Sequence, residues 1–289
     1  MSASAACDAQ GLPRNAMPLV PGEVQLRKTP RPHSDRYYLY MPRQWLPERT
    51  VVAVHGISRG AREQVSELMR AAQAHRAMVV APLFDQDRFG DYQRLGRRGI
   101  GERADRALQR VLADVETAVA TALTPFSVFG YSGGGQFAHR YALAHPAHVR
   151  RAVIAAAGWF TLPDESQPFP KGTGPTSRLA DLQFDLDGLL RIPTLVVASR
   201  NDTNRDPALR RRKQLDKSQG RNRLERAQRW VRAMRRAARA RGIEPVYRFR
   251  SLAHSDHDFV TAVRRDNLDE LIFNYLFDTS SQNQPETMT

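Results

Sequence analysis

The sequence contains one cysteine, Cys7, and no run of 18 apolar residues. A single cysteine excludes a disulfide within the chain and a metal site built on several cysteines. The lack of a long apolar run argues against a helix that crosses a bilayer. The first 23 residues also lack a basic start followed by an apolar core. We therefore expect no secretory signal and a cytoplasmic location.

Signatures of bound cofactors are missing as well. The phosphate loop G-x-x-x-x-G-K-[ST] does not occur, and "GRRGIG" (96–101) has the glycines of a dinucleotide site but follows no predicted strand. "HSDHD" (254–258) carries metal-ligating side chains, but no third histidine cluster or acidic counterpart occurs elsewhere. We therefore expect neither a cofactor nor a metal.

What the chain does have is enough apolar sequence for a core, since hydrophobic residues make up 41% of it. Short β-branched runs predict strands at 36–42, 50–56, 77–82, 126–130, 149–158, 192–199 and 244–252. Amphipathic spacing predicts helices at 59–76, 101–123, 134–146, 223–241 and 258–277. This alternation predicts an α/β fold with a mostly parallel central sheet and helices on both faces.

We expect a single folded domain over residues 31–277. Residues 1–30 are predicted to be a loosely ordered arm, and the polar tail 278–289 is predicted to be disordered. The segment 159–191 is the largest insertion between strands and is predicted to be irregular and close to the site. It is too short for a large cap domain. The sequence predicts no oligomeric state.

The stretch "GYSGG" (130–134) matches G-x-S-x-G, with a predicted strand before it and a predicted helix after it. This context is the one that the nucleophile elbow of a serine hydrolase requires. The glycines allow strand and helix to approach closely, and Ser132 projects above the carboxyl edge of the sheet. The backbone N–H of Gly133, at the helix N-terminus, is the expected donor to an oxyanion.

A nucleophilic serine needs a base and an acid that orients the base. Asp202 follows the strand predicted at 192–199, and Asp206 is the alternative acid. His254 and His257 both follow the strand predicted at 244–252. One of them is expected to be the base, because imidazole titrates near neutral pH.

Two loops are expected to complete the site. In "VHGISRG" (54–60), the backbone N–H of Ile57 is the expected second oxyanion donor, while His55 is expected to brace the loop. Trp159, Phe160 and Phe84 lie in loops at the open edge of the sheet and are candidates for the wall of a substrate pocket.

Taken together, these pieces resemble the α/β-hydrolase superfamily, near bacterial enzymes of the polyhydroxyalkanoate-depolymerase and feruloyl-esterase type. The resemblance covers about residues 50–260 and is carried by "VHGISR", "APLF", "FGYSGGGQFAHRYA", "AAGWFTLPD", "FPKGTG", "LVVASRNDT", "QGRNRLERA" and "AHSDHDF". It implies a triad of Ser132, Asp202 and His257, because His257 occupies the histidine position before the final helix. The implied activity is hydrolysis of small or polymeric carboxylic esters. A serine peptidase, thioesterase or acyltransferase with the same triad is the alternative.

The charge of the chain is concentrated in one segment. The formal net charge is +14, and residues 205–241 hold fifteen Arg or Lys against three acids. Apolar residues at helical spacing in 223–241 predict a solvated face of arginines outside them. The alternative is a non-catalytic protein that uses the 205–241 segment to bind nucleic acid or an anionic membrane.

Overall fold

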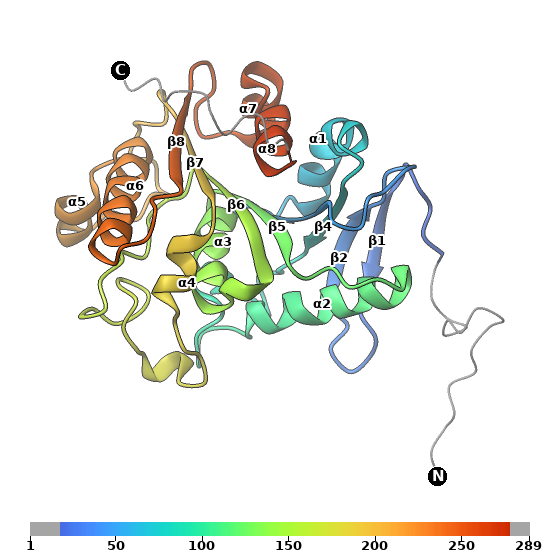
Figure 1. Ribbon diagram of the computed structural model, residues 1–289, viewed down its shortest axis with the longest axis horizontal. Helices are drawn as coiled ribbons and strands as arrows, with labels where there is room; N and C mark the ends of the chain where they lie inside the picture. The colour runs from blue at the N-terminus through green and yellow to red at the C-terminus, as the bar shows by residue number, and fades with distance from the viewer. Residues whose placement is uncertain (1–17, 278–289) are drawn as a thin grey trace, which may run out of the picture.

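The computed structural model describes residues 18–277, which form one eight-stranded sheet with helices on both faces (Figure 1). The strands are β1 (Val24–Lys28), β2 (Arg36–Tyr40), β3 (Thr50–Val54), β4 (Met78–Pro82), β5 (Phe126–Tyr131), β6 (Val149–Ala155), β7 (Thr194–Ser199) and β8 (Tyr247–Leu252). Their order across the sheet is β1-β2-β4-β3-β5-β6-β7-β8. β2 is antiparallel to both of its neighbours, and all other neighbouring strands are parallel. The predicted mostly parallel sheet is confirmed.

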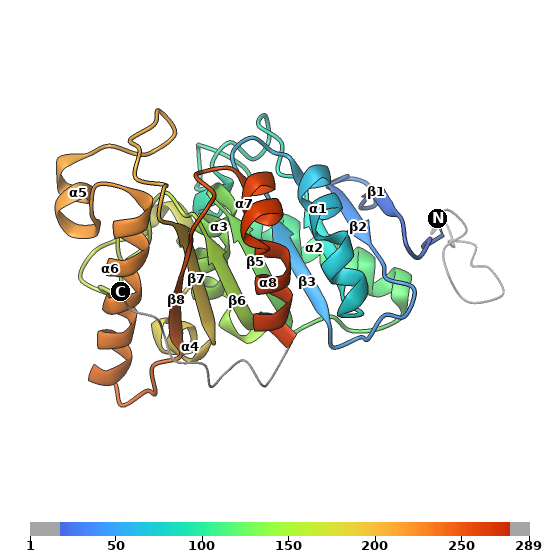
Figure 2. The ribbon, with the colours of Figure 1, turned by 90° about the horizontal axis from the view of Figure 1, so that it is seen from above.

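Helices cover the two faces of the sheet unequally (Figure 2). One face carries α1 (Ala61–Ala74), α7 (Phe259–Asp266) and α8 (Leu268–Phe277). The other carries α2 (Ala104–Val119), α3 (Gly133–Ala144), α4 (Leu186–Arg191) and α6 (Arg223–Ala240). The short helix α5 (Lys213–Gln219) lies beside α6.

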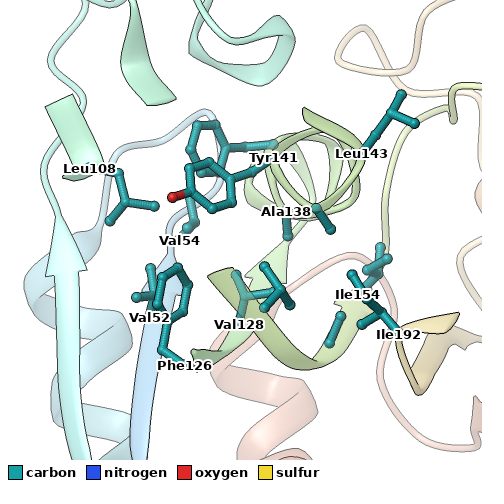
Figure 3. Close-up of a cluster of buried hydrophobic side chains, with 14 of the residues drawn as sticks. Val52, Val54, Leu108, Phe126, Val128, Ala138, Tyr141, Leu143, Ile154 and Ile192 are labelled. Atoms are coloured by element: carbon teal, nitrogen blue, oxygen red, sulfur yellow. The ribbon is translucent and has the colours of Figure 1, made fainter. Parts of the chain in front are cut away.

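Side chains of the central strands point alternately to the two faces of the sheet, so the hydrophobic core consists of two clusters, one on each face. Val52 and Val54 of β3 join the cluster that contains Leu108 and Tyr141 (Figure 3), whereas Val51 packs in the cluster under α1. Successive side chains of a strand point to opposite faces, so a strand covered on both sides must be apolar throughout. All five residues of β3 are buried.

The structure differs from the predicted elements at four places. Strand β1 lies inside the predicted arm 1–30 and pairs with β2. The predicted closing helix is two helices, because Asn267 adopts a left-handed conformation with φ 51° between α7 and α8. Helix α5 was not predicted. The insertion 159–191 contains a 3-10 turn at Ser177–Leu179 and helix α4.

Some expectations fall partly or wholly outside the described residues, namely those on positions 1–17 and on the tail 278–289. Within residues 18–277, no helix has both the length and the apolar character needed to cross a bilayer.

Candidate active site

Ser132 lies at a sharp turn between strand β5 and helix α3, as the glycine-rich motif predicts. Its backbone has φ 53° and ψ −111°, a conformation that non-glycine residues rarely adopt. A Cβ on Gly130 would lie 2.2 Å from the carbonyl oxygen of Gly134. A Cβ on Gly134 would lie 1.9 Å from the carbonyl oxygen of Val54. Only glycine fits at these two positions, and their close packing holds Ser132 in its strained conformation.

Ser132, His257 and Asp202 form a continuous hydrogen-bonded chain. Ser132 Oγ lies 3.0 Å from His257 Nε2, and His257 Nδ1 lies 2.8 Å from Asp202 Oδ2. An ionised carboxylate only accepts hydrogen bonds, so Nδ1 is the nitrogen that carries the proton. Nε2 is then free to accept the proton of the serine hydroxyl. The ring of Tyr131 stacks on His257 with 5.7 Å between centroids and limits its rotation.

Asp202 is buried and has a second partner that the sequence did not reveal. Its Oδ1 accepts a hydrogen bond of 3.0 Å from Nη1 of Arg223, which is itself buried in helix α6. Arg223 also bonds both carboxylate oxygens of Asp206, at 2.6 and 3.1 Å. This contact lowers the pKa of Asp206 to about 2. The structure therefore brings Asp202 to the histidine and turns the alternative acid, Asp206, toward Arg223.

The two candidate histidines have different surroundings. His254 is exposed, and its backbone N–H donates to Asp266 Oδ1 at 2.9 Å. The backbone N–H groups of Ala253 and Ser255 bond the same carboxylate at 3.0 and 2.8 Å. Asp266 thus fixes the loop that presents His257 to Ser132, while His254 faces solvent.

The two expected oxyanion donors lie side by side. A Cβ on Gly133 would be 3.3 Å from the backbone nitrogen of Ile57, and Gly133 opens helix α3. His55 braces the loop before Ile57: its Nδ1 lies 2.7 Å from the Gly56 carbonyl oxygen, and its Nε2 accepts from the N–H of Phe84 at 3.0 Å. Burial lowers the pKa of His55 to about 4, so the ring is neutral at pH 7.

A pocket of about 530 Å³ opens beside Ser132, with Ile57 and Trp159 in its wall. Phe84 and Phe160 do not line it. Phe84 is buried among other aromatic rings, and Phe160 stacks on Trp230 with 4.7 Å between centroids. Of the three aromatic residues expected in the pocket, only Trp159 is there, because the other two fill the core beneath the loops.

The same pocket contains arginines that the sequence did not single out as site residues. Arg94 and Arg97 reach it from the turn before helix α2, and Arg210 and Arg212 reach it from the loop before helix α5. The loop arginines belong to the basic 205–241 segment. That segment therefore contributes to the wall of the pocket.

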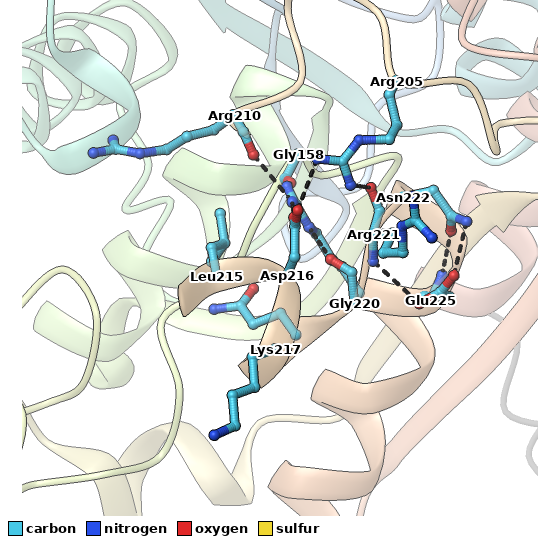
Figure 4. Close-up of polar contacts among 12 residues, drawn as sticks. Gly158, Arg205, Arg210, Leu215, Asp216, Lys217, Gly220, Arg221, Asn222 and Glu225 are labelled. Carbon is cyan, nitrogen blue, oxygen red and sulfur yellow. Dashed lines mark hydrogen bonds and ion pairs between the residues drawn. The ribbon is translucent and has the colours of Figure 1, made fainter. Parts of the chain in front are cut away.

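The prediction that the arginines of 205–241 form a solvated face is wrong at Arg223 and Arg226. Both are buried, because they lie on the stripe of α6 that faces the protein. Arg226 donates to the carbonyl oxygens of Gly158, Arg210 and Gly220 and to the carboxylate of Asp216. Figure 4 shows these four acceptor residues close together. Arg226 therefore links the loop that carries Arg210 and Arg212 to helix α6.

No group of three His, Cys, Asp or Glu side chains within residues 18–277 is arranged to hold a metal ion. The carboxylates near Ser132 are instead occupied by His257 and Arg223.

No protein-family model matches the chain, and no curated protein matches it. Among solved structures it is similar to poly(aspartic acid) hydrolase-1 from Sphingomonas sp. KT-1, with 22% identity over 88% of this chain and 100% of that one and a TM-score of 0.73. It is also similar to a poly(3-hydroxybutyrate) depolymerase from Bordetella parapertussis, with 24% identity, 92% coverage of each chain and a TM-score of 0.71. A fluorophosphonate-binding serine hydrolase from Staphylococcus aureus has 15% identity, 88% and 97% coverage and a TM-score of 0.56. The chain has the α/β-hydrolase fold, as the resemblance implied.

Proposed function

We propose that this protein is a serine hydrolase that cleaves carboxylic esters through an acyl-enzyme intermediate. The observation that carries the proposal is the chain of hydrogen bonds from Ser132 Oγ to His257 and on to the buried Asp202, at 3.0 and 2.8 Å. A serine hydroxyl is a weak nucleophile until a neighbouring base accepts its proton. The names of the similar structures, which include hydrolases of polymers, agree with this chemistry.

In the first half of the reaction, Ser132 Oγ attacks the acyl carbonyl while His257 Nε2 takes its proton. His257 then gives this proton to the leaving alcohol. Asp202 holds the ring in the required tautomer and stabilises the imidazolium that forms. Arg223 keeps Asp202 in place through the carboxylate oxygen that His257 does not use.

The charge that develops on the carbonyl oxygen is stabilised by the backbone N–H groups of Gly133 and Ile57. The first belongs to the positive end of helix α3, where donors are oriented before the substrate arrives. In the second half of the reaction, water gives a proton to His257 and attacks the acyl-enzyme. His257 then returns this proton to Ser132 Oγ as the bond to the acyl group breaks, which releases the acid and restores the free serine. No cofactor takes part.

A serine peptidase, a thioesterase and an acyltransferase use the same three residues, and they differ in the group that leaves or in the acceptor. We favour esters because one of the similar structures is named as a depolymerase of poly(3-hydroxybutyrate), which is a polyester. Comparing turnover of matched ester, thioester and amide substrates separates these activities.

The test is labelling with a fluorescent fluorophosphonate, followed by turnover of a 4-nitrophenyl ester. We expect the wild type to be labelled and Ser132→Ala to give no label. We expect the labelling rate of His257→Ala to be lower than that of the wild type by a factor of about a hundred or more. His254→Ala is the matched control, because it removes an exposed imidazole from the same loop.

Equal labelling rates in His257→Ala and His254→Ala would contradict the assignment of the base. A folded wild type that neither labels nor hydrolyses esters would overturn the proposed function. The non-catalytic alternative, binding of an anionic partner through residues 205–241, would then become the better hypothesis.

A further inference from the structure

Positive charge is concentrated on one wall of the pocket at Ser132. Arg94, Arg97, Arg210 and Arg212 all line it. Among the described residues, the only carboxylate that pairs with any of these four is Asp91, which binds Arg94 and, at 2.7 Å, Arg97. The guanidinium groups of Arg210 and Arg212 make no hydrogen bond or ion pair within residues 18–277.

A fifth guanidinium lies beneath this wall. Arg140 is fully buried, and its guanidinium carbon lies 4.1 Å from the ring centroid of Trp159. The guanidinium carbons of Arg210 and Arg94 lie 5.3 and 5.9 Å from the same centroid. Three cations therefore surround one indole ring. Arg140 donates to neutral oxygens only, on Gln93, Gln136 and Thr161, and its Nη2 has no partner among the described residues.

Such an arrangement costs free energy in the absence of a ligand. Like charges repel, and burial removes the water that would screen them. Burial, followed by the nearby charge of Arg94, lowers the pKa of both Arg140 and Arg210. Arg210 contacts the face of Trp159, but neither its guanidinium nor that of Arg212 has a hydrogen-bond acceptor among the described residues. An anion in the pocket would relieve the repulsion and supply the missing acceptors.

We propose that the pocket beside Ser132 binds a substrate that carries an anionic group, a carboxylate or a phosphate, close to the ester that is cleaved. Guanidinium groups bind both kinds of oxyanion in a bidentate manner. This inference rests on the proposed hydrolase function and specifies its substrate class.

The arginine wall continues away from Ser132, which favours substrates with more than one anionic group. Arg94, Arg97, Arg210 and Arg212 also line a neighbouring hollow of about 230 Å³, which Lys171 lines as well and Ser132 does not. A chain of repeating anionic units could therefore place one unit at Ser132 and the next beside Lys171.

The experiment compares esters that differ only in charge. Mono-4-nitrophenyl adipate carries a terminal carboxylate, and 4-nitrophenyl adipamate carries a neutral amide of similar size in its place. The readout is the ratio of their kcat/KM values, after the spontaneous rate is subtracted. This ratio is insensitive to a general loss of folded enzyme. A third ester carries a terminal phosphonate, and its kcat/KM is likewise divided by that of the amide ester. The anionic ester with the larger ratio identifies the preferred kind of anion.

We expect a wild-type ratio of about ten or more, as one or two charge-assisted hydrogen bonds provide. Arg210→Gln and Arg212→Gln should each lower the ratio by about threefold or more, and the double variant by more than either. Arg239→Gln is the matched control, because it removes one exposed arginine of α6 that lines neither pocket.

A wild-type ratio near or below one for both the carboxylate and the phosphonate ester would overturn the inference while leaving the hydrolase intact. So would a ratio that falls no more in Arg210→Gln and Arg212→Gln than in Arg239→Gln. Loss of the proposed function itself is recognised separately, because the wild type would then hydrolyse none of the esters and would not react with the fluorophosphonate.

Discussion

Asp202 has both of its carboxylate oxygens engaged, one by His257 and the other by Arg223. A carboxylate held from both sides cannot turn away from the imidazole, which keeps the proton on Nδ1 and the lone pair on Nε2. Asp206 binds Arg223 as well but makes no hydrogen bond to His257 within the described residues. The two acids are only four residues apart, but their different hydrogen-bond partners give them different roles.

Replacing Asp202 by asparagine should abolish most of the activity. The amide retains the shape of the side chain but can donate to Nδ1, which stabilises the wrong imidazole tautomer. We expect kcat/KM for a 4-nitrophenyl ester to fall by about a thousand- to ten-thousand-fold.

Asp206→Asn is the control, with an expected fall of less than about tenfold, since Arg223 keeps its bond to Asp202. Circular dichroism verifies that both variants are folded. Equal losses in the two variants would contradict the assignment of Asp202 as the acid that orients the histidine.

At the scale of single residues, the sequence predicted the groups that short motifs determine. Ser132 and the order of acid and histidine follow from a strand-turn-helix motif and from the ends of later strands. Arg223 and Arg226 were missed because helical periodicity assigns arginine to the solvated side, whereas here buried carboxylates and carbonyl oxygens stabilise them. Phe84 and Phe160 were misplaced because sequence position in a loop does not reveal which way a ring points.

At the scale of elements, the turn from β5 to α3 depends on contacts with β3 that lie far away in sequence. A Cβ on Gly134 would overlap the carbonyl group of Val54, so strand β3 and helix α3 could not both keep their places. Gly134→Ala should therefore lower the free energy of unfolding by about 3 kcal/mol or more and also displace Ser132. Urea unfolding monitored by tryptophan fluorescence measures the loss.

Gly158→Ala is the matched control for this experiment. The nearest atom to a Cβ there is Gln136 Nε2 at 3.3 Å, at the end of a side chain that can move. We expect a change of less than about 1 kcal/mol. A similar loss in the two variants would argue that close approach of helix and strand is not what requires glycine at position 134.

Element boundaries show where local sequence stops being informative. The buried strands are close to their predicted ranges because each is a short, continuously apolar run, and α1 and α2 because their apolar residues recur at helical spacing. Helix α3 directly follows the glycine-rich motif, which fixes where it begins. The break at Asn267 was missed because the apolar pattern continues through it from α7 into α8. Strand β1 was missed because its pairing with β2 is a tertiary contact of a short polar segment.

At the scale of the whole molecule, most of the net charge of +14 comes from residues 205–241, and the arginines of this segment have more than one role. Part of the basic segment holds the fold together, and part of it lines the pocket at Ser132. One consequence concerns stability at low pH, because a buried carboxylate that pairs with a cation loses this ion pair when it is protonated.

Asp105 is the clearest case, since it is fully buried and joins the start of α2 to the end of α3. Burial alone raises its pKa, but hydrogen bonds from Arg103 at 2.7 Å and His145 at 3.0 Å outweigh this and lower the pKa from 3.8 to about 2. A folded-state pKa below the unfolded value means that stability is fully present above about pH 4 and is lost as the pH falls toward 2.

Asp105→Asn should therefore be less stable than the wild type at pH 7, with a difference that narrows as the pH falls. Relative to pH 7, we expect the difference in the free energy of unfolding to be about 1 kcal/mol smaller at pH 3. It should be about 2 kcal/mol smaller once Asp105 of the wild type is protonated in both the folded and the unfolded state. Urea unfolding at several pH values between 7 and 3 measures it. Asp87→Asn, at an exposed position, should show no such trend. A stability difference between wild type and Asp105→Asn that is constant with pH would mean that the Arg103–Asp105–His145 cluster does not contribute to acid unfolding.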